Sequence, residues 1–292
     1  MEQEEGVSVE SSVAKLVFPD GTELAYRAWE AESPQGVVVG VHGIRSHAGW
    51  YARSGAYYAE RGYSVYFPDR RGSGLNREAT GKLSARRLVE DLVFFVGWVR
   101  DRCPGLAVHL EAISWGGKLS VAALLEKPEL ADTLILMAPG GIASRRGLPA
   151  GAKLRVLVGH VLGRDWRMEI PLEEPELFTA NQERLAFLRR DTLSLREAPV
   201  ELLWTSHVLD RRIAGAAPRL SLPVFLMLAE ADPICDNDGI LRFYDQLGSN
   251  VKQVKVYQGA GHTLEFEPDP EPIFADVVKW LGRFGSALGG ER

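Results

Sequence analysis

Cysteine is scarce in this sequence of 292 residues, and a long apolar run is absent. Cys103 and Cys235 are the only cysteines, and their wide separation speaks against a disulfide framework, so we expect free thiols in a reducing compartment, with Cys235 packed. No stretch approaches the roughly 18 consecutive apolar residues that a membrane-spanning helix needs. Residues 1–12 are acidic and polar, without the basic and apolar segments of a signal peptide. These absences predict a cytoplasmic protein that makes no stable insertion into a membrane.

The sequence also lacks an excess of positive charge. With 34 lysine and arginine residues against 39 aspartate and glutamate residues, the formal net charge is -5. This balance disfavours non-specific attraction to nucleic acid or to anionic membranes, so no nucleic-acid partner is expected. The hydrophobic share of 46% is ordinary for a globular protein, and nothing in the sequence specifies an oligomeric state. The length predicts one large domain or a core with a subdomain.

Short β-branched runs and helical patterns alternate along the chain. Three strand-like runs come first, at residues 13–18, 24–30 and 37–41, and Pro19-Asp20-Gly21 after the first run is a turn signal. Helices are then predicted at 51–61, 84–102 and 114–125, and strands at 64–68, 108–113 and 133–138. Runs without polar alternation are typical of strands buried on both faces of a parallel sheet. The pattern predicts an α/β fold with a mostly parallel central sheet and helices on both faces.

The alternation of strands and helices is interrupted between residues 142 and 220. This segment carries helical patterns at 152–162, 175–190 and 200–214 and no convincing strand. The alternation then resumes with strands at 223–229 and 251–257 and helices at 239–247 and 272–287. We expect a flexible acidic N-terminus (1–12), a core formed by 13–141 and 221–292, and a helical lid or cap at 142–220 above the carboxyl ends of the strands. An elaborate crossover connection is the alternative to a lid.

The strongest chemical signal surrounds Ser114, which directly follows the predicted strand at 108–113 and precedes an apolar helix. Ala112 and Gly116 stand two positions away on either side, as small residues must at a sharp strand-to-helix turn with a strained backbone. Such a turn exposes the serine Oγ, and the helix N-terminus that follows favours developing negative charge. Ser114 is therefore the candidate nucleophile, with a role as a helix cap as its simpler alternative.

A second buried strand, at residues 37–41, runs into His42, Gly43 and Ile44. Glycine after a strand end gives this oxyanion loop the freedom to point a backbone N–H at a substrate carbonyl oxygen. We assign the two oxyanion-hole donors to the N–H groups of Ile44 and Trp115. His42 is expected to hold the loop by hydrogen bonds.

Two further strand ends supply an acid and a base. Asp232 comes just after the strand at 223–229, where its carboxylate can accept a hydrogen bond from an imidazole; capping a turn is its simpler alternative role. His262 lies in a glycine-bearing loop after the last strand, from which it can reach both an acid and a nucleophile. The order Ser114, Asp232, His262 along the chain is the order that this type of fold imposes on a catalytic triad. We expect His262 to act as general base and Asp232 to orient it.

At these residues the sequence resembles the α/β-hydrolase superfamily over its whole length. Within the superfamily it is similar to the monoacylglycerol lipase and lysophospholipase group, also described as serine aminopeptidase S33-like. The similarity rests on four segments of the core and one of the insertion, at 42–51, 59–74, 231–236, 259–262 and 190–193. Ala112 stands where the group has the first glycine of its serine motif, and the acidic residue usual in the group's oxyanion loop is absent after Ile44. The resemblance implies an α/β-hydrolase fold and an esterase or lipase.

The expected reaction is hydrolysis of a carboxylic ester by a serine hydrolase, through an acyl-enzyme on Ser114. The apolar insertion suits an acyl chain, so the expected partner is a small-molecule ester, such as a monoacylglycerol-like or lysophospholipid-like lipid. Hydrolysis of amide, peptide or C–C bonds, or perhydrolysis, by the same three residues is an alternative, as is a non-catalytic ligand-binding role. No cofactor is required. No metal is expected either, because His42 and His47 match no zinc spacing, and His47 is expected at the rim of the pocket.

Overall fold

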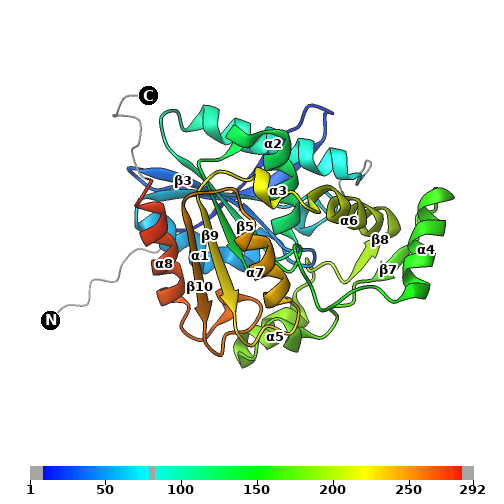
Figure 1. Cartoon of the computed structure of the whole chain (residues 1–292). Coiled ribbons are helices and arrows are strands. Elements are labelled where there is room, and N and C mark those ends of the chain that lie inside the picture. The colour runs from blue at the N-terminus through cyan, green and yellow to red at the C-terminus, as the bar shows by residue number, and fades with distance from the viewer. Residues whose placement is uncertain (1–8, 79–82, 285–292) are drawn as a thin grey trace.

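The computed structural model describes residues 9–78 and 83–284 of the chain. An eight-stranded sheet crosses its centre, and helices cover both faces of this sheet (Figure 1). In spatial order the sheet consists of β1 (Ser12–Val17), β2 (Glu23–Trp29), β4 (Tyr63–Pro68), β3 (Gly36–Val41), β5 (Val108–Ile113), β6 (Thr133–Met137), β9 (Val224–Ala229) and β10 (Lys252–Tyr257). Most of the expected flexible segment, residues 1–12, lies outside the described residues, and Ser12 at its end already belongs to β1.

The strand directions confirm the predicted mixed but mostly parallel sheet. β1 and β2 form an antiparallel hairpin, and β2 also pairs antiparallel with β4. From β4 to β10 all neighbouring strands run parallel. In the hairpin turn Gly21 has a φ of 81°, and the Thr22 N–H donates to Asp20 Oδ1 over 3.1 Å. The turn predicted at this position is therefore confirmed, and its chemistry is that of an aspartate and a glycine.

The central strands carry the hydrophobic core. Every residue of β3, β5, β6 and β9 is buried, and the sequences of β3, β6 and β9 accordingly show no polar alternation. β5 differs, because it carries His109 and Glu111, whose buried side chains bond to Thr133 Oγ1 at 2.9 Å and to the Tyr58 hydroxyl at 3.0 Å. Large side chains fill the layers between sheet and helices, among them Trp29, Phe95, Phe225 and Trp280. This packing holds the carboxyl edge of the sheet in place, and the candidate site residues follow the strands at that edge.

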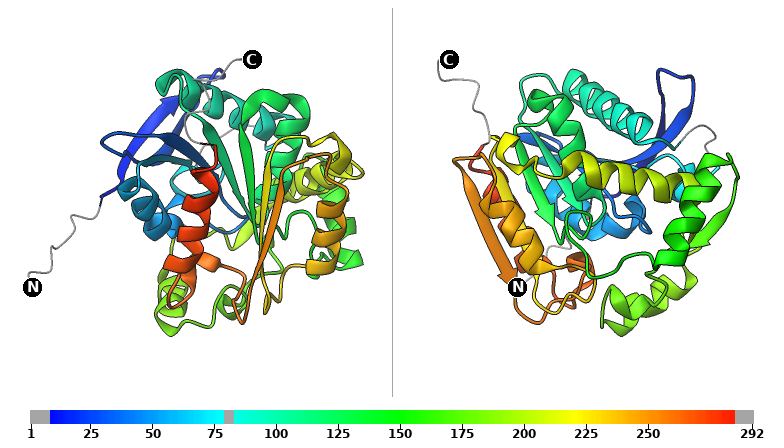
Figure 2. Two further views of the ribbon diagram at one scale, coloured as in Figure 1. Left: turned by 60° about the vertical axis from the view of Figure 1, so that its left-hand side comes forward. Right: turned by 45° about the vertical axis from the view of Figure 1, so that its right-hand side comes forward.

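The helices of the core are α1 (Ala52–Glu60), α2 (Ala85–Arg102), α3 (Gly116–Glu126), α7 (Asn237–Asp245) and α8 (Glu271–Leu281). α1 packs against α8 on one face of the sheet, and α2 packs against α3 on the other (Figure 2). α8 ends at Leu281, before the predicted end at residue 287; residues 282–284 leave the helix, and 285–287 lie outside the described residues. Within the described residues, no helix is both long and apolar enough to cross a membrane.

Residues 142–220, between β6 and β9, form the insertion. Its helices are α4 (Ala150–Val161), α5 (Gln182–Arg190) and α6 (Val200–Ile213), and they lie beyond one end of the sheet (Figures 1 and 2). The expectation that the insertion contains no strand is wrong. β7 (Arg167–Glu169) and β8 (Glu197–Pro199) form a short antiparallel pair. Strands of three residues are too short to produce a periodic pattern in the sequence, which is why they were not predicted.

A second prediction for the insertion, one helix over 175–190, is also wrong. The segment begins with a 3-10 turn at Pro175–Leu177, and the α-helix starts only at Gln182. Asn181 separates the two, because its side chain accepts hydrogen bonds from the N–H groups of Glu183 and Arg184 and so caps the helix.

The insertion is fastened to the core through Asp191. Asp191 Oδ2 accepts hydrogen bonds from Trp50 Nε1 at 2.7 Å and from His47 Nε2 at 3.2 Å. The Leu193 N–H donates to Asp191 Oδ1 at 2.9 Å. Burial acts to raise the pKa of Asp191, but the hydrogen bonds from His47 and Trp50 lower it below its usual value. The expectation of a rim position for His47 is wrong, because the imidazole is buried between core and insertion.

Replacing Asp191 by alanine would leave the Trp50 and His47 N–H groups buried without this acceptor. We expect Asp191→Ala to lower the free energy of unfolding by about 1–3 kcal/mol, the usual cost of an unpaired buried polar group. Asp165→Ala removes an exposed carboxylate of the insertion and serves as the control, with an expected change below about 0.5 kcal/mol. Urea denaturation measures both, and equal stability of the two variants would contradict the role of Asp191 as an anchor.

Candidate active site

Ser114 lies in the turn between β5 and α3 with a backbone φ of 52°. This left-handed conformation is strained for a residue that has a Cβ. Gly116 permits the close passage of the chain, because a Cβ at that position would lie 2.2 Å from the Val41 carbonyl oxygen. Ala112, on the other side of the turn, is fully buried within the sheet. The helix that follows has no side-chain cap, so Ser114 is not a helix cap.

Three strand ends bring Ser114, Asp232 and His262 together. Ser114 follows β5, Asp232 follows β9 and His262 follows β10. His262 Nε2 lies 2.9 Å from Ser114 Oγ, and His262 Nδ1 lies 2.7 Å from Asp232 Oδ2. The carboxylate can only accept, so Nδ1 carries the proton and Nε2 is the ring atom that can take the serine proton.

The Asp232 carboxylate is held by more than the imidazole. Its Oδ1 accepts hydrogen bonds from the N–H groups of Ile234 at 2.7 Å and Cys235 at 2.9 Å. Burial acts to raise the pKa of Asp232, but the electrostatic interaction and hydrogen bond with His262 and the bonds from Cys235 lower it below its usual value. Asp232 is therefore ionised at neutral pH and is fixed in the orientation that His262 requires.

Cys235 packs beside this pair of side chains. Its Sγ donates to the Ala138 carbonyl oxygen at 3.3 Å and lies 3.7 Å from His262 Nδ1. Burial and the neighbouring Asp232 raise the pKa of the thiol well above its usual value, which fits the expected packed thiol. Asp232, Cys235 and His262 together offer ligand atoms within 4.8 Å of one another, but a metal bound there would displace the hydrogen bond between His262 and Asp232.

Two backbone N–H groups of residues that line the site are left without a partner in the described part of the chain. Within the described residues, the N–H groups of Ile44 and Trp115 have no hydrogen-bond partner. Both residues line the same pocket as Ser114. Gly43, before Ile44, packs closely on the serine, since a Cβ there would lie 3.2 Å from the Ser114 Cβ. The arrangement offers two free donors beside the serine, as a developing oxyanion requires.

His42 holds the loop that carries Ile44, as expected. The Arg70 N–H donates to His42 Nε2 at 2.9 Å, so the proton of the neutral ring is on Nδ1, which donates to the Gly43 carbonyl oxygen at 2.7 Å. Burial lowers the pKa of His42 well below its usual value, and the neighbouring Arg70 adds to this effect. A neutral His42 keeps both hydrogen bonds and thereby the position of the loop.

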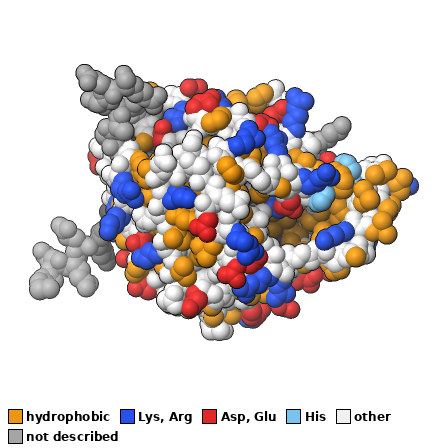
Figure 3. Space-filling model, in the orientation of Figure 1, with side chains coloured by type: hydrophobic (Ala, Val, Ile, Leu, Met, Phe, Trp, Pro, Cys, Tyr) orange, Lys and Arg blue, Asp and Glu red, His pale blue; other side chains and the backbone are white. Residues whose placement is uncertain are grey.

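Ser114 opens into a cavity of about 630 Å³ between core and insertion. Apolar side chains outnumber polar ones in its walls, and α4 and α6 of the insertion contribute to them. Figure 3 shows a hollow on the side of the molecule where α4 lies, with hydrophobic side chains around its rim. The apolar residues of the lining include Ile142, Leu148, Leu154, Val156, Leu157, Ile170, Leu172, Leu203, Trp204 and Ile234.

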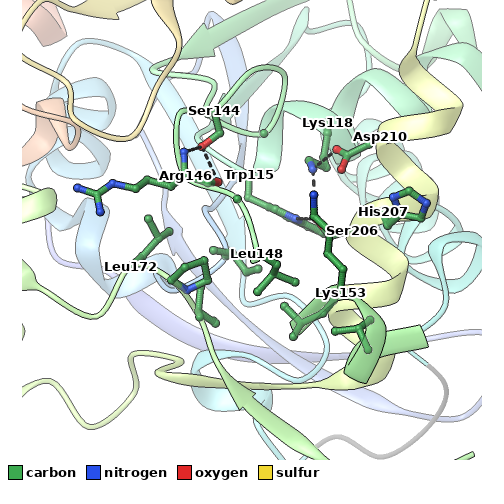
Figure 4. Close-up of a pocket in the computed structure, with 18 of the residues that line it drawn as sticks. Trp115, Lys118, Ser144, Arg146, Leu148, Lys153, Leu172, Ser206, His207 and Asp210 are labelled. Carbon is green, nitrogen blue, oxygen red and sulfur yellow. Dashed lines mark hydrogen bonds and ion pairs between the residues drawn. The ribbon is translucent and has the colours of Figure 1, made fainter. Parts of the chain in front are cut away.

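Polar residues that were not predicted as site residues also line this cavity. Lys118 of α3 and Ser206 of α6 face it from one side (Figure 4). A lysine four positions after Ser114, near the start of a mostly apolar helix, is a signal from which Lys118 could have been found. Ser206 carries no comparable signal, because its position depends on how α6 packs on α3.

A mostly parallel eight-stranded sheet, with a strained serine between a central strand and its helix, defines an α/β-hydrolase. The model of the serine aminopeptidase S33 family of hydrolases matches residues 32–269. The chain belongs to this family, and the expected α/β-hydrolase fold and group are confirmed.

Individual relatives carry names of lipases. Monoglyceride lipase of Rattus norvegicus is 27% identical over 273 residues, which cover 91% of this chain and 89% of the relative. Monoacylglycerol lipase of Mycolicibacterium smegmatis is 26% identical, over 89% of this chain and 93% of the relative. The crystal structure of a soluble variant of monoglyceride lipase from Saccharomyces cerevisiae has the same fold, with a TM-score of 0.82, 20% identity and coverage of 96% of this chain and 98% of that chain. The expected enzyme class, carboxylic ester hydrolase, is thereby confirmed.

The close approach of Gly116 to the Val41 carbonyl oxygen can be tested by a substitution that adds one methyl group. Gly116→Ala places a Cβ 2.2 Å from the Val41 carbonyl oxygen, and backbone atoms cannot easily move aside. We expect the variant to lower the free energy of unfolding by about 1–3 kcal/mol. Gly147→Ala, at a glycine with open space around it, is the matched control and should change it by less than about 0.5 kcal/mol. If chemical denaturation found the two variants equally stable, the turn would not depend on glycine at this position.

Proposed function

We propose that this protein hydrolyses carboxylic esters of lipids, such as monoacylglycerols or lysophospholipid-like esters, with Ser114 as nucleophile. One observation carries the proposal. Hydrogen bonds connect Ser114 Oγ to His262 Nε2 over 2.9 Å and His262 Nδ1 to Asp232 Oδ2 over 2.7 Å, beside a cavity in which apolar side chains outnumber polar ones. A serine, a base and an orienting acid are the groups that acyl transfer needs, and the apolar cavity suits an acyl chain.

In the first step of this mechanism, Ser114 Oγ attacks the carbonyl carbon of the ester. His262 Nε2 takes the serine proton as the new C–O bond forms, and it then gives the proton to the departing alcohol. The N–H groups of Ile44 and Trp115 donate to the carbonyl oxygen while it carries negative charge. The product of this step is an ester between the acyl group and Ser114, with the alcohol released.

In the second step, water attacks the acyl-enzyme. His262 Nε2 accepts a proton from the water, and the tetrahedral intermediate uses the same two N–H donors. Asp232 stabilises the positive charge that the imidazole carries in both steps and keeps the proton of the neutral ring on Nδ1. Collapse of the intermediate returns the proton to Ser114 Oγ and releases the carboxylic acid.

The lipid character of the substrate is supported by the surface as well as by the cavity. α4 presents four exposed apolar side chains at helical spacing, Leu154, Leu157, Val158 and Val161, and Leu162 directly after the helix is exposed as well. An exposed apolar patch of this kind marks a surface that meets other apolar groups. The names of the relatives from Rattus norvegicus and Mycolicibacterium smegmatis support a monoacylglycerol as the substrate.

The insertion serves, in this proposal, as a lid over the core formed by 13–141 and 221–292. Two observations support the role. Residues of the insertion provide walls of the cavity that contains Ser114, among them Leu172 and Leu203. The Leu195 N–H also donates to the Arg45 carbonyl oxygen at 2.9 Å, so the insertion contacts the loop that carries the Ile44 donor.

The proposal is tested by hydrolysis of 4-nitrophenyl esters with acyl chains from two to sixteen carbons. Ser114→Ala removes the nucleophile, and we expect kcat to fall by at least about 10³-fold, as in other enzymes of this mechanism. Ser33→Ala, at an exposed serine of a distant loop, is the control and should retain wild-type turnover. An apolar cavity predicts a preference for medium or long chains over acetate.

Two results would count against the proposal. Folded Ser114→Ala protein with more than a tenth of wild-type turnover would exclude Ser114 as nucleophile. A wild-type enzyme that hydrolyses none of these esters would exclude the assigned reaction.

A further inference from the structure

The cavity beside Ser114 carries more positive than negative charge. Lys118, Arg146 and Lys153 line it, against one carboxylate, that of Asp210. The protein as a whole has the opposite balance, with a net charge of -5. A neutral monoester requires none of these charges, so the cavity carries a feature that hydrolysis of a simple ester does not explain.

Lys118 is the buried member of this group. Its side chain is only 7% exposed, whereas Arg146 and Lys153 are exposed residues at the rim. Lys118 Nζ donates to Ser206 Oγ at 3.2 Å and to Asp210 Oδ1, and the Asp210 side chain is half-exposed (Figure 4). Burial of an ammonium group is costly, and burial lowers the pKa of Lys118, while Asp210 opposes this shift.

Lys118 and Ser206 each have one N–H or O–H donor without an acceptor among the described residues. An ammonium group has three N–H donors, and Lys118 uses two of them on Ser206 and Asp210. Ser206 Oγ accepts from both Lys118 Nζ and Trp115 Nε1, the latter at 3.0 Å, and its own hydroxyl proton has no acceptor. Both groups belong to residues that line the cavity. The cluster therefore offers an acceptor-bearing ligand two hydrogen-bond donors, one of them charged.

A purely structural role would be to join α3 of the core to α6 of the insertion. An apolar residue in place of Lys118 could make that contact without the cost of removing an ammonium group from water. A structural bridge also leaves the two unused donors unexplained. A ligand that carries negative charge accounts for both features, since a charge-assisted hydrogen bond is stronger than a neutral one.

We propose that Lys118 and Ser206 form a subsite for an anionic group, a carboxylate or a phosphate, that the ester substrate carries in addition to its scissile bond. The inference rests on the proposed function, because the anion is part of the substrate that Ser114 attacks. The anion has two chemical sources. It is either a carboxylate at the far end of the acyl chain or a phosphate on the alcohol.

Two matched pairs of substrates distinguish these sources. The first pair is 4-nitrophenyl octanoate and the mono-4-nitrophenyl ester of octanedioic acid, which differ by a carboxylate at the end of the acyl chain. The second pair is 1-decanoylglycerol and 1-decanoylglycerol 3-phosphate, which differ by a phosphate on the alcohol. The measured quantity is the ratio of kcat/KM for the anionic ester to kcat/KM for its neutral partner, in each pair.

Lys118→Met and Asp210→Asn should change this ratio in opposite directions. Loss of the charged donor in Lys118→Met is expected to lower the ratio about 10- to 100-fold in one of the pairs. Asp210→Asn removes the competing carboxylate and should raise the ratio in the same pair, mainly through KM. Lys279→Met, at an exposed lysine on α8, is the control and should leave both ratios at their wild-type values.

The opposite changes of the ratio in Lys118→Met and Asp210→Asn distinguish recognition of an anion from a purely structural role. If Lys118 only joins α3 to α6, both variants break the same bridge and change turnover of the anionic and neutral esters alike. That result would overturn the proposal, as would a wild-type enzyme without preference for either anionic ester. Lys118→Arg, which keeps the charge, should retain most of the preference.

The proposed subsite can be rejected or supported independently of the proposed reaction. Turnover of the neutral esters without any effect of Lys118→Met on the ratio would reject the subsite and leave the reaction intact. If no ester is hydrolysed, the proposed function fails, and calorimetric titration with octyl phosphate then tests the subsite directly. Binding that weakens in Lys118→Met and tightens in Asp210→Asn would support the subsite, and equal binding by all three proteins would reject it.

Discussion

The left-handed backbone of Ser114 is the constraint on which the site depends. A φ of 52° at a serine costs on the order of 1–3 kcal/mol, and the packed sheet and helix on either side must hold it there. The same turn brings Gly116 against the Val41 carbonyl oxygen, so that the chain leaves the sheet sharply. As a result the Ser114 Oγ faces His262 while the Trp115 N–H is left without a partner in the described chain. One strained residue thus positions together the groups that we propose as the nucleophile and as one oxyanion donor.

α3, which begins at this turn, also connects the site around Ser114 to the insertion. Trp115 Nε1 and Lys118 Nζ both donate to Ser206 Oγ on α6, so the first turn of α3 contacts the insertion through polar groups. Asp191 provides a second buried connection, to Trp50 and His47. These are two of several connections that hold the walls of the cavity in register with the serine. In our account, the first turn of α3 contributes to both substrate recognition and acyl transfer.

Much of the fold and site could be predicted because the signals are local. Buried strands without polar alternation, and glycine or alanine two positions from Ser114, depend only on neighbouring residues, and the chain order of Ser114, Asp232 and His262 follows from the order of the strands. The three-residue strands β7 and β8 and the bond of His47 to Asp191 could not be predicted, because they depend on partners far away in sequence. Lys118 lies close to Ser114 in the sequence and could have been noticed, but its role could not be predicted. That role depends on α6, which places Ser206 and Asp210 beside Lys118.

The central claim is that His262 activates Ser114. A fluorophosphonate probe reacts with an activated serine, and mass spectrometry of the tryptic peptide 103–118 locates the adduct on the chain. The account predicts that the wild-type protein is labelled at Ser114 and that His262→Ala, although folded, is labelled at least about 10²-fold more slowly. Labelling at the same rate in both proteins, or no adduct on Ser114 in folded wild-type protein, would contradict it.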